Sequence, residues 1–187
     1  MTEFRSRRKG AVYVELPPYA AGLLANLTRQ LIELLSDGES TSASDDPLEA
    51  MVGLDGPRDT PEDPALLRLL PDAHPEDPEA SAEFRRLTER SLRDAKVRDA
   101  VVVLGHLSAF EEEGGEDLEF EIARDDVRSW LRCLTDLRLT LAERLGITAN
   151  DEAYWQSLEA GDEKLPVYEI YQWLSYLLES LLDAAKN

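Results

Sequence analysis

Apolar residues recur at helical spacing in four long stretches of the chain. Side chains three and four positions apart share one face of a helix, so the pattern predicts amphipathic helices over about 19–35, 78–107, 126–145 and 166–184. Local signals support the boundaries. Asp63-Pro64 and Asp77-Pro78 each offer an N-cap acceptor followed by proline at the first helical position, and Gly146 stands where a helix can end. Shorter helices are predicted over about 64–70 and 152–158.

Alternation of apolar and polar residues replaces the helical period in two places. The first place follows Gly10, which can supply the positive φ of a tight turn, so we expect a β-hairpin over residues 4–16. The second place, 118–122, predicts a third strand. This strand could add to the hairpin, since an isolated hairpin is only marginally stable. The alternating residues are Val12, Val14 and Leu16, then Leu118, Phe120 and Ile122. The fold class is mainly α: a helical bundle of about four long amphipathic helices plus short helices, with a minor two- or three-stranded antiparallel sheet.

The longest predicted helix has a mixed face. At 100° per residue, one side collects Phe84, Leu87, Thr88, Ser91, Ala95 and Val102. The pattern predicts that this side lies against the core.

Length and charge narrow the class of protein. The 187 residues predict one domain, 1–187, and the net charge of −19 disfavours binding to nucleic acid or to anionic membranes. Most of the negative charge lies in two segments: residues 37–63 have a net charge of −8, and residues 111–119 have a net charge of −6. We interpret 37–63 and 111–117 as solvated acidic loops, with an acidic docking loop as the alternative for 37–63. No apolar stretch is long enough for a signal peptide or a membrane span, so we expect a cytoplasmic protein.

Residues with catalytic or metal-binding chemistry are few. The single cysteine, Cys133, is expected to be a half-buried inert thiol, and His106 a satisfied core histidine. His74 and His106 lie far apart, and no metal-binding or nucleophile motif occurs. The sequence therefore predicts no catalytic residue, no cofactor and no metal, and a protein that is not an enzyme.

Two arginines stand in apolar stripes. Arg98 lies between Ala95 and Val102, and Arg138 lies between Leu134 and Leu141. A guanidinium that faces a core must be paired, because its burial otherwise costs several kcal/mol. A buried brace against carboxylates is favoured, and a small-anion-binding cleft is the alternative. The candidate cluster is Arg98, Arg138, Asp72, Asp136 and Arg85.

Two further side-chain sets have predicted roles. Arg85 and Arg86 diverge by 100° on their helix, so ion pairs with Glu83 and Glu89 are expected in place of a basic patch.

In the last helix, Tyr168, Trp173 and Tyr176 spread outside the apolar stripe. They are candidate interface residues of a homodimer, unless the N-terminal sheet covers them.

Three segments carry a family resemblance: 63–73, 83–89 and 130–139. Together they resemble the actinobacterial domain-of-unknown-function family number two-thousand-and-seventeen, over essentially the whole chain. The resemblance implies a bacterial cytoplasmic protein encoded near the Clp protease adaptor, with no established activity and no catalytic residue. We therefore expect a non-enzymatic protein-interaction or accessory factor with a partner in the proteolysis machinery. The alternatives are a small-anion binder or enzyme using the arginine and carboxylate cluster, and a transcriptional regulator, which the acidity disfavours.

Overall fold

The computed structural model describes residues 3–36, 60–108 and 117–186. Its elements, in chain order, are β1 (Glu3–Ser6), a 3-10 turn (Arg8–Gly10), β2 (Val12–Leu16), α1 (Pro18–Ser36), α3 (Pro64–Leu69), α4 (Pro78–Leu107), β3 (Leu118–Ile122), α6 (Val127–Leu145), α7 (Glu152–Gln156) and α8 (Leu165–Lys186). The fold is mainly α with a three-stranded antiparallel sheet, which confirms the predicted class. The acidic loops predicted at 37–63 and 111–117 lie almost wholly outside the described residues.

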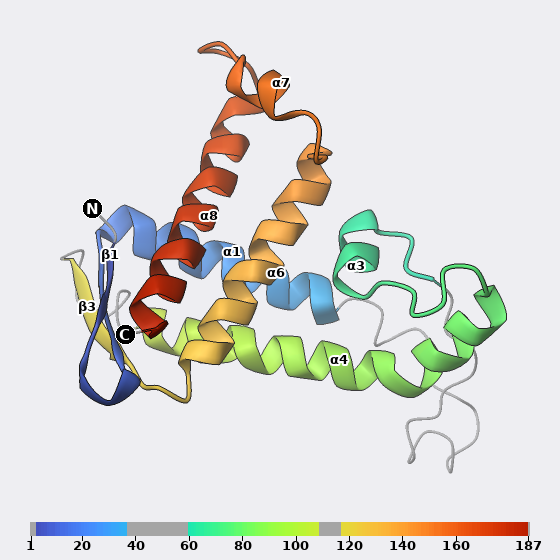
Figure 1. The fold of residues 1–187 in the computed structure, drawn as a ribbon, viewed down its shortest axis with the longest axis horizontal. Helices are drawn as coiled ribbons and strands as arrows, with labels where there is room; N and C mark the ends of the chain where they lie inside the picture. The colour runs from blue at the N-terminus through green and yellow to red at the C-terminus, as the bar shows by residue number, and fades with distance from the viewer. Residues whose placement is uncertain (1–2, 37–59, 109–116, 187) are drawn as a thin grey trace.

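Two helix pairs and one small sheet make up the architecture (Figure 1). Helices α1 and α4 pack side by side and run in opposite directions. Helices α6 and α8 form a second antiparallel pair that crosses the first steeply, with α7 at the far end of this pair. The sheet packs against the C-terminal part of α8, and α3 packs on α6.

The sheet buries one face, as the alternation predicted. Strand β2 is central, and its Val12, Val14 and Leu16 are fully buried. Val14 pairs with Phe4 on β1 and with Phe120 on β3, so apolar side chains of all three strands point to the same side. Phe4 and Phe120 both contact the indole of Trp130, with ring centroids 6.0 and 5.7 Å apart.

Local signals set the ends of the helices. The Asp63 side chain accepts a hydrogen bond from the Ala65 amide at 2.8 Å, and Asp77 accepts one from the Ala80 amide at 3.0 Å. Gly146 ends α6 in the left-handed region at φ 73°, which costs glycine little because it has no Cβ. Each of these ends was predicted from the sequence.

The buried face predicted for α4 is wrong in its N-terminal half. Phe84 and Leu87 lie outward, with 43% and 57% of their surface exposed. The buried side of this half is polar and repeats every four residues: Ser81, Arg85, Glu89 and Arg93. Only further along does the same side become apolar, at Ala100, Val103 and Leu107. The physical reason is that this polar side has hydrogen-bonding partners from distant parts of the chain.

No helix in the described ranges is both long enough and apolar enough to cross a membrane.

Candidate functional site

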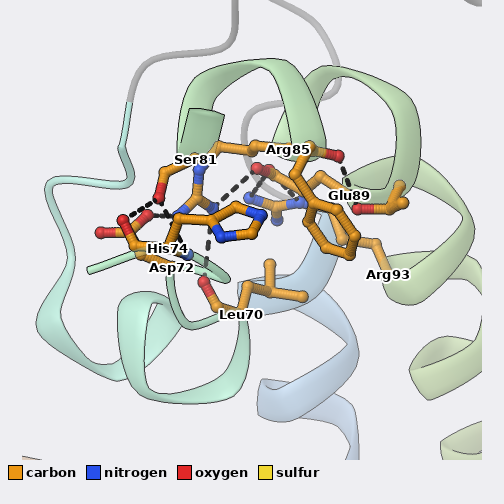
Figure 2. Close-up of polar contacts among 9 residues, drawn as sticks. Leu70, Asp72, His74, Ser81, Arg85, Glu89 and Arg93 are labelled. Atoms are coloured by element: carbon orange, nitrogen blue, oxygen red, sulfur yellow. Dashed lines mark hydrogen bonds and ion pairs between the residues drawn. The ribbon is translucent and has the colours of Figure 1, made fainter. Parts of the chain in front are cut away.

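Four charged side chains gather beneath the N-terminal half of α4 (Figure 2). We call Asp72, Arg85, Glu89 and Arg93 the buried charge cluster. Glu89 stands at its centre, because α4 places Arg85 one turn before it and Arg93 one turn after it. The side chains of these three residues are each only 5% exposed.

Hydrogen bonds link the members of the cluster to one another and to two backbone carbonyls. Arg85 donates to Asp72 Oδ1 at 2.6 Å, to Glu89 Oε2 at 3.0 Å and to the Leu70 carbonyl at 3.3 Å. Arg93 donates to Glu89 Oε1 at 2.8 Å and to the Leu35 carbonyl at 2.8 Å. Burial alone would lower the pKa of Arg85, but the hydrogen bonds to Glu89 and Asp72 outweigh it and raise the pKa. The guanidinium is therefore charged at every accessible pH.

The arrangement suits a structural brace. Two cations and two anions leave the cluster neutral, which is the condition under which charges tolerate burial. Its hydrogen bonds tie three segments together: the end of α1, the chain after α3, and α4. The adjacent space, between Leu70 and Leu92, is about 20 Å³, room for about one water molecule. Among the residues that the structure describes, the space beside Arg85 is therefore too small for an anion much larger than a water molecule.

The structure brings together only one pair of the predicted cluster, Arg85 with Asp72. Arg98 is exposed, so the prediction that it faces the core is wrong. Arg138 is half-buried at the edge of α6, with its guanidinium 6.0 Å from the ring centre of Tyr171 on α8. Asp136 pairs elsewhere, with Lys96.

The sequence analysis did not predict that Glu89 and Arg93 belong to a buried cluster. A signal was present, because Ser81, Arg85, Glu89 and Arg93 follow one another at four-residue spacing. The two ion pairs predicted on this helix are confirmed: Arg86 pairs with Glu83 at 2.7 Å, and Arg85 with Glu89 at 3.0 Å.

A second polar pair lines a groove between α4 and α6. Lys96 donates to Asp136 Oδ1 at 2.7 Å, in a groove of about 550 Å³ that also has Leu92, Leu131 and Leu139 on its walls. Burial raises the pKa of the Asp136 carboxyl, although the hydrogen bond from Lys96 acts in the opposite direction. The leucines make most of the groove surface apolar, and Asp99, Arg128 and Arg132 add further charges to its lining.

Cys133 is buried between the helices, and the side chain of His106 packs between α4 and the sheet. Cys133 is only 1% exposed, so it is fully buried and not half-buried as predicted. This burial raises the pKa of its thiol to about 12. His106 stacks on Phe120 at 5.5 Å, its Nδ1 lies 2.9 Å from the Val102 carbonyl, and its Nε2 lies 3.7 Å from Asp126 Oδ2. These contacts give the imidazole polar and aromatic partners, as predicted, but its side chain is 22% exposed, so His106 lies at the edge of the core.

The candidate interface residues of α8 have different environments. Tyr176 is 44% exposed, whereas Trp173 packs partly buried against the core. Tyr168 stacks between Trp155 of α7 and Tyr171, at centroid distances of 5.1 and 6.1 Å. The predicted homodimer stays a prediction.

Side chains able to bind metal ions are dispersed in the described ranges. There, no group of three or more His, Cys, Asp or Glu side chains is placed to hold a metal ion.

Comparison with known proteins gives a family and named relatives. The family described as Domain of unknown function (DUF2017) matches residues 1–185. The protein named "Oxidative stress regulator AosR" of Mycobacterium tuberculosis (strain ATCC 25618 / H37Rv) is 34% identical over 185 residues, covering 89% of this chain and 78% of the relative. The "Putative oxidative stress regulator AosR" of Mycobacterium leprae (strain TN) is 32% identical over 181 residues, covering 89% and 79%. No solved structure gives a significant match.

Proposed function

The chain belongs to the DUF2017 family, and from this membership we propose that it is a non-enzymatic regulatory protein that acts by binding another protein. The names of its mycobacterial relatives support a role in the response to oxidative stress. A cytoplasmic location and a partner in the proteolysis machinery, both expected from the sequence and the family resemblance, are part of the same proposal.

The observation that carries the proposal is the outer side of α4. Phe84, Leu87 and Val101 lie on it with 43%, 57% and 53% of their surface exposed. Scattered exposed apolar residues are ordinary, but several on the outward side of one long helix are typical of a protein-binding face. The buried charge cluster holds the opposite side of the same helix in place. The brace therefore fixes which side of α4 a partner can meet.

A direct role in binding DNA has less support. Phosphate contacts require lysine and arginine side chains on one face, and the net charge is −19. Arg85 and Arg93 are buried, and Arg86 is paired with Glu83. Measurable affinity for DNA at physiological salt would revive the transcription-factor alternative.

A pull-down with matched variants tests the proposal. The tagged chain is incubated with an actinobacterial lysate, and captured proteins are quantified by mass spectrometry. The double variant Leu87→Lys/Val101→Lys should lose the partner. The control Tyr19→Lys/Leu182→Lys, which adds the same charge at exposed apolar positions on α1 and α8, should retain it. Capture of no protein by the wild type, or equal capture by both variants, would refute the role of this face.

A further inference from the structure

A groove at the far end of the α6–α8 pair has a chemical character of its own. It lies between α8 and the segment that contains α7, and its volume is about 430 Å³. Helix α8 contributes one side of it through residues at helical spacing: Tyr168, Gln172, Ser175 and Glu179. The first and last of these positions are eleven steps apart, or about 16 Å of helix at 1.5 Å per residue. An extended peptide of about five residues has this length.

The charged residues that line the groove are all acidic. Asp151, Glu152 and Glu179 line it, and no lysine or arginine does. Burial would raise the pKa of Asp151, but hydrogen bonds from the Thr148 backbone and from the Trp155 indole lower it overall. Asp151 is therefore ionised at neutral pH, so the groove presents negative charge to any ligand.

Aromatic rings form the floor next to these carboxylates. Trp155 stacks on Tyr168 with an interplanar angle of 24°, and Tyr168 stacks on Tyr171 with an angle of 21°. Cations already lie against this stack from outside the groove. The Lys164 ammonium is 5.6 Å from the Trp155 ring centre, and the Arg138 guanidinium is 6.0 Å from that of Tyr171. The ring of Tyr176, which also lines the groove and is 44% exposed, offers a further aromatic face on which a cation can lie.

Two buried polar atoms in the groove lack a regular hydrogen bond. They are the indole Nε1 of Trp155, a residue only 3% exposed, and Oδ1 of Asp151. The indole does affect the pKa of the Asp151 carboxyl, so the two groups are neighbours, but their geometry falls short of a well-formed bond. Because Oδ1 is itself buried beside the indole, Asp151 contributes negative charge to the groove, and the Trp155 indole N–H reports on changes next to that charge. Buried polar atoms without a regular hydrogen bond are rare in folded proteins.

We propose that this groove binds a short extended segment of a partner protein that carries lysine or arginine. The positive side chain pairs with Asp151, Glu152 and Glu179, and the flanking residues pack on the Tyr168 and Tyr176 rings. The inference rests on the proposed function for the partner being a protein. It adds a second contact for that partner, separate from the outer side of α4, and names the side chains that recognise it.

The test uses the full chain and a defined probe. The probe is a fluorescein-labelled peptide of three Lys-Leu repeats, compared with its Glu-Leu counterpart. Because any basic peptide is attracted to a chain of charge −19, a charge-matched control is essential. Glu152→Gln/Glu179→Gln removes two groove carboxylates. Glu33→Gln/Glu121→Gln removes two exposed carboxylates from α1 and β3, so both variants have the same net charge.

Two readouts decide the outcome. Fluorescence anisotropy should show the dissociation constant rising roughly tenfold in the groove variant and less than about twofold in the control. In ¹⁵N-labelled protein, the Trp155 indole N–H resonance should shift on titration, while those of Trp130 and Trp173 stay in place. Equal weakening in both variants, or binding without a Trp155 shift, would overturn the groove proposal. The α4 pull-down would be unaffected by that result, so failure of the groove and failure of the proposed function are distinguishable.

Discussion

Substitution of Glu89 by glutamine tests whether the buried charge cluster holds the fold together. Glu89 accepts hydrogen bonds from three guanidinium nitrogens, one of Arg85 at 3.0 Å and two of Arg93 at 2.8 Å. Glutamine is nearly the same size, but it carries no charge and offers an NH₂ group where one carboxylate oxygen stood. Two buried guanidiniums would lose their shared counter-ion.

The expected cost follows from the burial. Removing one partner of a buried ion pair destabilises a protein by roughly 3–5 kcal/mol, because the remaining charge is left in a low-dielectric environment. That is a large fraction of the 5–15 kcal/mol that stabilises a typical domain. The control is Glu83→Gln, which breaks the exposed pair with Arg86. A surface pair contributes at most about 1 kcal/mol, so this variant should be close to wild type.

Urea denaturation followed by circular dichroism measures both free energies of unfolding by linear extrapolation. A third variant, Arg85→Met/Glu89→Leu/Arg93→Leu, replaces three charges with apolar groups. It should cost less than Glu89→Gln alone, because the charge that loses its partner is then Asp72, whose side chain is 32% exposed and can be solvated. If Glu89→Gln and Glu83→Gln lose the same small amount, the cluster is solvated and does not act as a brace. If the apolar triple variant is the least stable, the ion pairs contribute net stability and the reasoning about desolvation fails.

Three further predictions concern other titratable groups. Asp136 has a pKa raised above 3.8, so in the folded state it retains its proton to higher pH than in the unfolded state. The stability of the wild type should be compared with that of Asp136→Asn by the difference between their free energies of unfolding. This difference should fall as pH rises from about 4 through the raised pKa. Asp63 has a lowered pKa because hydrogen bonds from Arg144 and the Ala65 amide outweigh its burial. The stability it contributes should be lost as pH falls below about 4, and at pH 7 Asp63→Ala should lower the free energy of unfolding by about 1 kcal/mol through the lost N-cap. An identical pH profile for Asp63→Ala and wild type would contradict this. The Cys133 thiol should resist iodoacetamide at pH 8 in the native protein and react in 6 M urea, as mass spectrometry can show. Complete labelling of the folded protein would contradict its burial.

The sequence predicts those features whose causes are local. The caps at Asp63 and Asp77 need only an acceptor side chain and amides two or three residues away. The hairpin around Gly10 needs a turn residue at positive φ, and the structure has φ 77° there. In each case the interacting groups are neighbours in the chain, so the sequence alone contains the information.

The orientation of α4 has a non-local cause. Selecting the apolar side of this helix points Phe84 inward, but Arg93 bonds a carbonyl 58 positions earlier in the chain, and Arg85 bonds Asp72 across the turn between α3 and α4. These partners become visible only when α1 and the chain after α3 are placed in space. The same limit explains the error at Arg98. Its neighbours Ala95 and Val102 are themselves only partly buried, so they do not mark the side that packs.

The chemistry of Cys133 restricts how the proposed role in oxidative stress could operate. A thiol reacts with oxidants through its thiolate, and a pKa of about 12 leaves a thiolate fraction of only about 10⁻⁵ at pH 7. One cysteine also cannot form a disulfide within these 187 residues. Under the proposed function, the oxidant signal therefore reaches this chain through the partner: oxidation would change the partner or its abundance, and this chain would respond by binding or releasing it. Peroxide added to the purified protein should then leave both the Trp155 resonance and the affinity for the Lys-Leu peptide unchanged. A change in either would place oxidant sensing within this chain and refute the argument.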